Sequence, residues 1–469
     1  MALSIEQNPL YTLNPVGQEV IFTVLDAATV SAYYNVKYVA EVHISTVDID
    51  LATTTAIVGT FKTTPNNTGA GMYDFRPILE SFVSPDNLAA LGSEYKGAAT
   101  TAIKTHPLHL VDKYSLNDNV VRYLKIRFTI EGSATATGTV APIDDEEVDS
   151  VQYTLINGYL KYTDVINRDA TGNFGFNTEI FQLGGGATGN ELLTNAPTTQ
   201  YANINDYGTL SFMTTPKAGD ETNTTLDYFK IKLYDDSGSP LGTDIIIENV
   251  DGNGGNTTWD SATKNQLFHL GCFPANLKNW SSIFLANTTD LSYYLVEAFN
   301  ISNASISDRY TININCPTLK GYEPIRLTWL NQWGVWDYYT FKMKSTKMIS
   351  TKGSTYQQLE GTWNESIYLP NGYKGGKKAF RVNAMEKISM NTDFVNESES
   401  EWFEELINSP EVYILEGFQV DATLSSPNTY VTPARLTTSS YTRKTVANDK
   451  LMQYTFEVEK SKTLRTQSV

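Results

Sequence analysis

The sequence has few of the residues from which catalytic, metal and disulfide sites are built. It contains only four histidines and two cysteines: His43, His106, His109, His269, Cys272 and Cys316. Two cysteines permit one disulfide but exclude a disulfide framework or a multi-thiolate zinc site. No run of about 18 apolar residues occurs, so no membrane-spanning helix is expected. The N-terminus lacks a basic segment followed by an apolar run, so no signal peptide is expected.

Charge is also scarce, and most of it has one sign. Charged residues make up 19% of the chain, and the net charge is −17. An acidic balance of this size argues against direct binding to nucleic acid or to an anionic membrane. Thr, Asn, Tyr and Gly are abundant instead, which favours short strands joined by polar turns over helices. The length of 469 residues predicts about two to four domains.

The most distinctive stretch is Arg326–Phe341, which contains three of the seven tryptophans: Trp329, Trp333 and Trp336. Arg326–Leu330 and Tyr338–Met343 are rich in residues that favour strands. Asn331–Gly334 lies between them and can reverse the chain. We therefore predict an aromatic hairpin. Its rings either fill a domain core or, on the loop, expose Trp333 or Trp336 as an anchor for a neighbouring subunit.

The N-terminal part predicts a first β domain over residues 1–140. Tyr34–Ile44 and Val121–Ile130 alternate between apolar and polar residues, as a sheet with one buried face requires. Ile57–Phe61 is a shorter predicted strand. Asp74–Phe82 resembles a short helix that Asp74 could cap and Pro85 could end.

Residues 141–150 are an acidic run that we predict to be a solvated linker, with a calcium site as the alternative. A second β domain is expected over 151–317. It includes a hairpin in which Leu226–Leu233 pairs with Thr243–Glu248 through a turn at Asp235–Gly238. Gly184–Gly186 is expected to be a flexible connection.

A third β domain is expected over 318–469, with the aromatic hairpin, one helix and a C-terminal tail. Asn396–Asn408 has the capping residues and the apolar stripe of a helix, and Ser409–Pro410 would end it. The last ten residues are expected to need a partner to be ordered. The fold class is therefore mainly β, with several Ig-like or related β-sandwich or barrel modules and a few short helices.

No motif in the chain predicts catalysis. None of the histidines has the spacing of a catalytic triad, and no nucleophile elbow occurs. Pro107 separates His106 from His109, which argues against a metal pair. Other partial matches are better interpreted as turns or surface residues: Asp251–Asn256, Gly375–Lys378, Glu404 and Glu405. We therefore expect a protein that is not an enzyme and assign no catalytic, cofactor-binding or metal residues.

Several segments resemble virion proteins of phages that infect Bacteroidetes, including crAss-like phages. Tyr34–Ile44 (YNVKYVAEVHI) followed by Gly71–Leu79 (GMYDFRPIL) is similar to their N-terminal pattern. Leu327–Phe341 (LTWLNQWGVWDYYTF) is the most specific match, with Trp333 where an aliphatic residue is more usual. Further similar segments lie in the middle and at the end of the chain: Glu191–Pro197, Tyr207–Phe212, Trp402–Tyr413 and Asp449–Glu457.

The resemblance implies a structural protein of a short-tailed virion, assembled in the host cytoplasm. The expected role is a ring-forming subunit of the tail or collar below the portal. Its expected partners are copies of itself in a cyclic homo-oligomer and other tail, portal or fibre proteins. Two alternatives remain: a receptor-binding or glycan-binding fibre module that uses Trp333 and Trp336, and a polysaccharide-degrading enzyme.

Overall fold

The computed structural model describes most of the chain, with gaps. The described residues are 2–52, 57–83, 96–97, 108, 113–117, 120–161, 164, 175–183, 190–214, 226–248, 266–300, 302–315, 321–363, 365–370, 372–416, 431–438, 440, 442 and 452–465. They divide into two compact units. Unit 1 takes its described residues from Met1–Asn315 and Leu330–Asp337, and unit 2 from Cys316–Trp329, Tyr338–Phe418 and Ser425–Val469.

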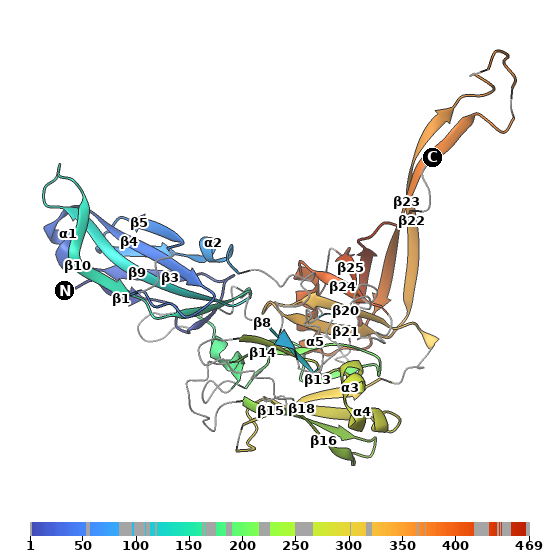
Figure 1. The fold of residues 1–469 in the computed structure, drawn as a ribbon, viewed down its shortest axis with the longest axis horizontal. Helices are drawn as coiled ribbons and strands as arrows, with labels where there is room; N and C mark the ends of the chain where they lie inside the picture. Colours follow the sequence, from blue (N-terminus) through green and yellow to red (C-terminus); the bar gives the residue numbers. More distant parts are fainter. Residues whose placement is uncertain are drawn as a thin grey trace. The chain divides into compact units, whose positions relative to one another are not determined.

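The mainly β fold class is confirmed. The first part of unit 1 consists of two sheets that share one core (Figure 1). The three-stranded sheet has the order β1-β3-β6, with bounds Ser4–Gln7, Ile21–Leu25 and Ala70–Asp74. The six-stranded sheet has the order β2-β11-β9-β4-β5, and β10 also pairs with β9. Its strands are β2 Leu13–Pro15, β4 Tyr34–Ser45, β5 Gly59–Thr63, β9 Arg122–Ser133, β10 Ala141–Asp149 and β11 Tyr153–Ile156.

The two longest strands of this sandwich, β4 and β9, follow the alternation in the sequence. They pair antiparallel, and Ala40 lies opposite Phe128 in the core. Tyr34 lies at the start of this alternation on its apolar side, but it is 53% exposed at the end of β4. Two short helices flank the sheets, α1 (Ala27–Ala32) and α2 (Arg76–Leu79). The predicted helix at 74–82 is thus shorter than expected, although Asp74 does accept a hydrogen bond from the Arg76 backbone N–H at 3.0 Å.

The predicted acidic linker at 141–150 is wrong, because Ala141–Asp149 forms β10, antiparallel to β9. The guanidinium of Arg127 on β9 donates two hydrogen bonds to the Asp149 carboxylate, at 2.8 and 3.0 Å. A basic partner on the adjacent strand therefore balances acidic charge that, in the sequence, suggested a solvated linker. The sandwich also continues past residue 150, because β11 pairs with β9 and β2.

The second part of unit 1 has two five-stranded sheets with the orders β12-β14-β17-β8-β7 and β13-β19-β18-β15-β16. The strands of the first are β7 Lys96–Gly97, β8 Tyr114–Asn117, β12 Gln182–Leu183, β14 Leu210–Thr214 and β17 Gln266–Leu270. Those of the second are β13 Thr199–Ala202, β15 Leu226–Tyr234, β16 Pro240–Glu248, β18 Tyr293–Asn300 and β19 Tyr310–Ile314. Helices η3 (Thr178–Phe181), α3 (Pro274–Trp280) and α4 (Ser282–Asn287) accompany them. The predicted β15–β16 hairpin is confirmed.

The predicted domain boundary near residue 140 does not separate the sheets. β8 lies within the predicted first domain but pairs with β17 of the second. A hydrophobic cluster also combines Leu13 and Ile156 of the sandwich with Phe181 and Trp333. The predicted domain 1–140 and all but the last two residues of the predicted domain 151–317 accordingly fall within unit 1. Gly184–Gly186 lies outside the described residues.

Unit 2 is built on a seven-stranded sheet with the order β21-β20-β24-β25-β26-β23-β22. Its strands are β20 Ile325–Leu330, β21 Trp336–Phe341, β22 Ser345–Gln358, β23 Gly376–Asn391, β24 Val412–Leu415, β25 Val431–Leu436 and β26 Thr455–Lys460. The predicted helix is confirmed as α5, Glu397–Asn408, with a capping box between Asn396 and Glu399. Its Trp402 ring packs 5.0 Å from the Trp329 ring.

The described part of the C-terminal tail pairs with its own chain. The backbones of Leu464 and Ala384 exchange two hydrogen bonds of 2.8 Å, which adds a bridge beside β23. The expectation of a tail that needs a partner is therefore wrong at Leu464. Among the described residues, no helix is long and apolar enough to cross a membrane.

Candidate interaction arm

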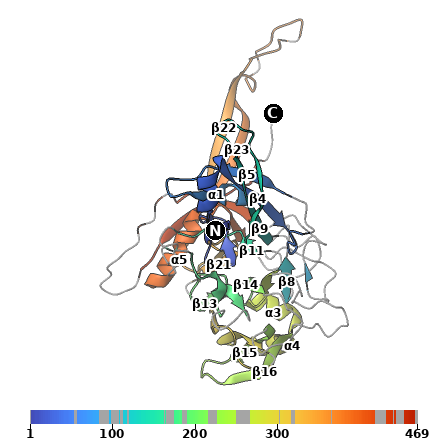
Figure 2. The same ribbon diagram turned by 90° about the vertical axis from the view of Figure 1, so that its left-hand side faces the viewer.

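Two strands of unit 2 continue past the rest of their sheet as a narrow ribbon (Figures 1 and 2). β22 and β23 pair from Ser345–Met390 to Gln358–Gly376. β26 pairs with β23 only over Lys387–Asn391, and Leu464 adds one bridge at Ala384. Among the described residues, the ribbon beyond Asn383 therefore has two strands and no further support. We call residues 345–391 the interaction arm. A two-stranded ribbon is marginally stable by itself in water, so contacts with a partner would benefit it.

The loop at the end of the arm, Leu359–Gly375, is held by local contacts. The Thr362 hydroxyl donates to the Ile367 carbonyl at 2.6 Å and accepts from the Leu369 N–H at 2.8 Å. The rings of Trp363 and Tyr368 meet edge to face at 5.6 Å. These bonds define the loop's shape without burying its side chains.

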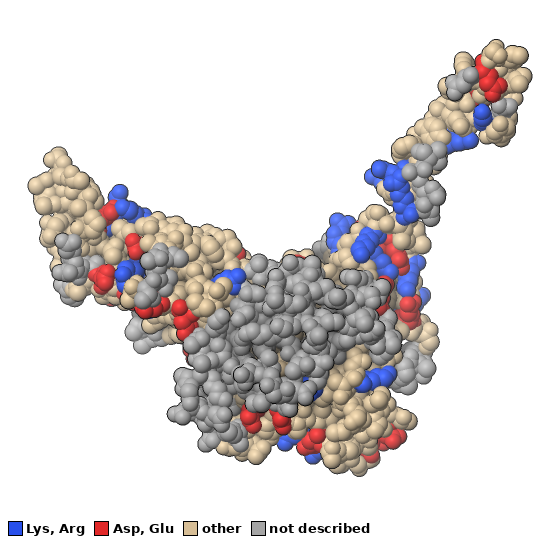
Figure 3. Space-filling model, in the orientation of Figure 1, with Lys and Arg blue, Asp and Glu red and all other residues tan. Residues whose placement is uncertain are grey.

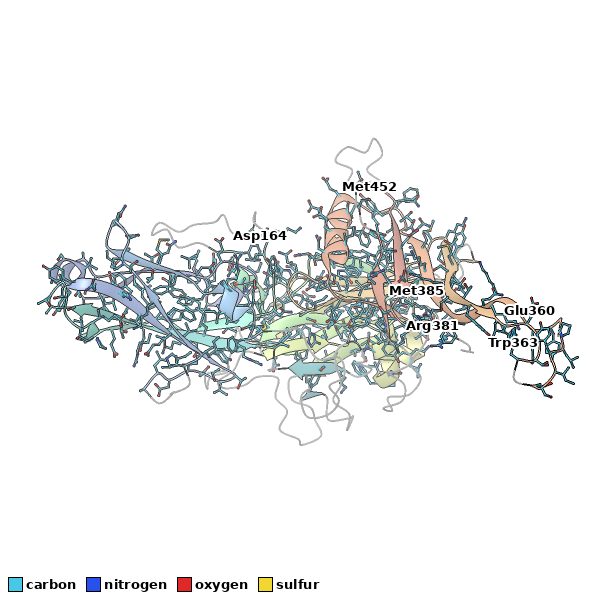
Figure 4. All side chains as sticks on the ribbon, turned by 90° about the horizontal axis from the view of Figure 1, so that it is seen from above. Asp164, Glu360, Trp363, Arg381, Met385 and Met452 are labelled. Atoms are coloured by element: carbon cyan, nitrogen blue, oxygen red, sulfur yellow. The ribbon has the colours of Figure 1, made fainter. Side chains whose placement is uncertain are left out.

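The tip of the arm exposes large apolar side chains to solvent. Trp363 is 65% exposed and Tyr373 is 77% exposed. Over half of the surface of each tip residue in this set is accessible: Leu359, Trp363, Ile367, Tyr368, Leu369 and Tyr373. Figure 4 shows Trp363 and Glu360 at the far end of the arm. Apolar side chains gathered in this way, rather than scattered singly, mark interaction surfaces.

The stem of the arm is basic in an acidic protein. Residues 345–391 contain seven Lys or Arg and three Glu, a net charge of +4, against −17 for the whole chain. Figure 3 shows basic side chains along the ribbon and acidic ones at its tip. Five basic side chains in the outer part of the arm form no ion pair with a described carboxylate: Lys352, Lys374, Lys377, Lys378 and Arg381. The stem is thus suited to an acidic partner.

The pairing of the arm places three of these cations on one face. Ser354 lies opposite Arg381 and Tyr356 lies opposite Lys378, because Phe380 is an extra, bulged residue. Residues two apart on β22 share a face with each other and with the residues opposite them. Lys352, Lys378 and Arg381 therefore lie on the same face, which we call the basic face. Without the bulge, and with the register at the base of the ribbon unchanged, Lys378 would point to the other side.

The outer edge of β22 is protected against pairing with another strand. β22 is the last strand of its sheet, and it carries Lys347 and Lys352. The register shift between Ser354 and Thr355 further interrupts the ribbon. Lysines and bulges are features by which proteins prevent edge-to-edge association. Recognition by side chains of the arm is therefore favoured over addition of a strand to its edge.

The base of the arm is anchored by ion pairs to the neighbouring strands. Glu459 on β26 is buried between Lys387 of β23, at 3.8 Å, and Arg435 of β25, at 3.6 Å. Lys460 contacts Glu416 at 2.6 Å and Glu386 at 3.3 Å. Burial alone would lower the pKa of Lys460, but its hydrogen bonds and attraction to these two carboxylates raise it. The ribbon thus leaves the sheet from a fixed base.

The aromatic hairpin, unlike the tip of the arm, has its tryptophans buried in the core. The Trp333 ring packs 4.5 Å from the Phe181 ring, and the Trp333 indole N–H donates to Asn195 at 3.1 Å. Trp333 and Trp336 are both buried. The prediction of an exposed anchor on this loop is therefore wrong, and the alternative of a core hairpin is correct. Sequence reasoning missed Trp363, because a tryptophan at the tip of a polar ribbon has no pattern of its own.

The structure brings together one pair of residues that resembles part of a catalytic triad. Ser211 on β14 lies opposite His269 on β17, with 2.7 Å between the hydroxyl and Nδ1. Burial lowers the pKa of His269 to about 3, so its imidazole is neutral at pH 7 and can accept the hydroxyl proton. Nε2 has no described hydrogen-bond partner, so no carboxylate orients the ring. Both side chains are buried, which makes this a hydrogen bond within the core.

The remaining candidates from the sequence do not combine into a site among the described residues. No group of three or more His, Cys, Asp or Glu there could hold a metal ion. His43 is buried in the sandwich, Glu405 is buried on α5, and Gly375–Lys378 lies at the start of β23. Cys272 is buried and unpaired. Several predicted positions lie outside the described residues: His106, His109, Asp251–Asn256 and Cys316.

Comparison with known proteins identifies no family for this chain. No protein-family model and no curated protein matches the chain.

Proposed function

We propose that this protein is a structural component of a bacteriophage virion that acts by assembly and not by catalysis. The role it fits best is a ring-forming subunit of the tail or collar below the portal. The observation that carries the proposal is the arm, with an apolar tip on a basic ribbon that the described parts of its own unit leave uncovered. The resemblance of Leu327–Phe341 to phage virion proteins supplies the virion context.

The physical case for assembly rests on exposed apolar surface. Aromatic side chains bury about 150–250 Å² each and dominate interface energetics. Trp363, Tyr368 and Tyr373 would place three of them in one contact. An arm that docks on a different surface of the next copy makes a heterologous contact, which closes into a ring or continues as a filament. A specific interface usually buries about 1,600 Å², so the arm would act together with other surfaces.

Electron microscopy of the purified full-length protein tests this proposal. The expected result is closed rings of uniform size whose number rises with protein concentration. An arm variant that lacks apolar tip residues should give single subunits. Single subunits of the native protein at every concentration, with or without the other tail, portal and fibre proteins, would refute a ring-forming role. No cofactor, nucleic acid or membrane is proposed to take part.

The second candidate is a receptor-binding or glycan-binding module. It is favoured by the same exposed rings, since Trp363 and Tyr373 could stack on sugars as well as on protein. The buried Trp333 and Trp336 cannot act in this way. A glycan array distinguishes the candidates: selective binding that Trp363→Ala abolishes supports the glycan module, and an array without binding supports assembly alone.

A further inference from the structure

The apolar face of the seven-stranded sheet continues from the core of unit 2 onto the arm. At the base of β23, Ile388 and Met390 are buried, and Met390 lies opposite the buried Phe456 of β26. The Phe403 ring of α5 packs 5.5 Å from the Phe456 ring, so α5 covers this face at the base. Residues two apart on a strand share a face. The same face of β23 therefore extends outward to Val382, which is 42% exposed.

Three exposed apolar side chains lie together on this continuation. Val382 lies opposite Gly353 of β22, and Ile349 is on the same face of β22, nearer the base. Leu464 lies opposite Ala384 in the bridge beside β23, so it also shares this face. Ile349 is 62% exposed and Leu464 is 49% exposed. We call Ile349, Val382 and Leu464 the base patch.

The charged side chains next to the base patch have partners within the chain. Lys347 and Glu386 lie on the same face as Ile349. The Lys347 ammonium is 2.9 Å from the Glu323 carboxylate, and the Glu386 carboxylate is 3.3 Å from the Lys460 ammonium. A partner that covers the base patch would therefore meet charges that are already paired. The patch thus suits an apolar occupant, because burial of paired charges costs less than burial of single ones.

The tip of the same arm is too far away to cover the base patch. Ile349 and Gln358 are nine residues apart on β22, or about 30 Å at ~3.3 Å per strand residue. β22 and β23 stay paired over this length, and the tip loop begins only beyond it. Figure 4 accordingly shows Trp363 at the far end of the ribbon from Met385.

We propose that the tip of the arm docks on the base patch of a second copy of this chain. The inference rests on the proposed assembly function and specifies the surface that receives the tip. The tip presents large rings, Trp363 and Tyr373, whereas the base patch borders the small residues Gly353 and Ala384. Close packing requires large side chains against small ones. Two base patches packed on each other would place small residues opposite small residues.

A tip-to-base contact uses two different surfaces of the chain. Each copy therefore provides one contact and receives another, as a ring or a filament requires. The contact removes the exposed apolar side chains of both surfaces from water together. It also supports each ribbon with a neighbouring copy, and a two-stranded ribbon is only marginally stable by itself.

Two variants test the contact through the Kd of self-association, measured by sedimentation velocity of the full chain. The base variant is Ile349→Gln with Val382→Gln, and the tip variant is Trp363→Ser with Tyr373→Ser. Each alone should weaken self-association at least about tenfold, because polar groups without partners replace apolar side chains that the contact buries.

An equimolar mixture of the two variants identifies the receiving surface. At a concentration where each variant alone is a monomer, the mixture should form dimers with one copy of each. The intact tip of the base variant then docks on the intact base patch of the tip variant. These dimers should not grow, because the tip and the base patch that remain are both altered. A mixture that stays monomeric would overturn the tip-to-base contact.

The matched control is Met348→Gln with Met72→Gln. Met348 adjoins Ile349 but lies on the opposite face of β22, and both methionines are over half exposed. The control should associate like the native protein. If circular dichroism shows that the base variant does not fold, Ile349→Thr replaces it, because threonine favours strands, and it should weaken association in the same direction.

The same measurements separate this contact from the assembly function. A native chain that stays monomeric at every concentration refutes both. A base variant that associates like the native protein, beside a tip variant that does not, leaves the assembly function standing and shows that the tip docks on another surface.

Discussion

Trp333 donates its indole N–H to the side-chain oxygen of Asn195, 138 residues earlier in the chain, at 3.1 Å. The same ring packs against Phe176 and Phe181. A single side chain thus connects the turn of the aromatic hairpin to the core of unit 1. The most tryptophan-rich segment is therefore structural, whereas Trp363 on the arm is 65% exposed.

Replacement of Trp333 by Ala should destabilise the protein by about 3–5 kcal/mol, the usual cost of removing a buried large aromatic side chain. Trp363→Ala is the matched control, because that side chain is 65% exposed. It should change stability by less than about 0.5 kcal/mol. Urea unfolding, followed by circular dichroism, measures both. Equal losses for the two variants would mean that the burial of Trp333 is not what stabilises unit 1.

Gly334→Ala should also destabilise unit 1, by more than about 2 kcal/mol. Gly334 has a φ of 77°, and an added Cβ would lie 1.9 Å from the carbonyl oxygen of Asn157. Both the left-handed backbone and the clash oppose a side chain there. Gly372→Ala, in the tip loop, meets nothing within 4 Å. It should be neutral or stabilising by up to about 1 kcal/mol. Thermal unfolding of the pair tests the requirement for glycine, and a Gly334→Ala protein as stable as Gly372→Ala would disprove it.

His269 should make stability depend on pH in the acid range. Its pKa is lowered to about 3 in the folded protein by burial, from an ordinary value near 6.5. The unfolded state therefore binds more protons between these values, and the folded state loses stability as pH falls through that window. The slope should approach about 1.4 kcal/mol per pH unit.

The measurement is the free energy of unfolding at pH 7, 6 and 5, for the native protein and for His269→Gln. The gap between the two should shrink by about 1 kcal/mol from pH 6 to pH 5, because only the native protein has this buried imidazole to protonate. His43 is present in both and cancels. Curves that stay parallel would show that His269 is not held neutral by its surroundings.

Local patterns predicted the elements whose signal lies within a single segment. The alternation in Tyr34–Ile44 predicted β4. The turn at Asp235–Gly238 predicted the β15–β16 hairpin, and the capping residues at Asn396 predicted α5. In each case the side chains that decide the structure are within a few residues of one another, so the sequence alone carries the information.

Features set by pairing between distant segments could not be predicted. β10 resembled a linker in the sequence, because the partner of Glu147 and Asp149 is Arg127 on another strand. Ser211 and His269 meet only through the register of β14 and β17. The outer part of the arm has polar and basic strands without a buried face, so no alternation marks it. The side on which Lys378 lies depends on the bulge at Phe380.

In the assembly that we propose, the tip of the arm is a contact between copies of this protein. It is tested most directly by sedimentation equilibrium of the native chain and of a variant with Trp363→Ser, Ile367→Ser and Tyr373→Ser. Hot-spot truncations cost about 2 kcal/mol or more each, so the variant should associate at least about a hundredfold more weakly while its unfolding curve stays unchanged. A native chain and a variant that sediment alike at every concentration would contradict the account.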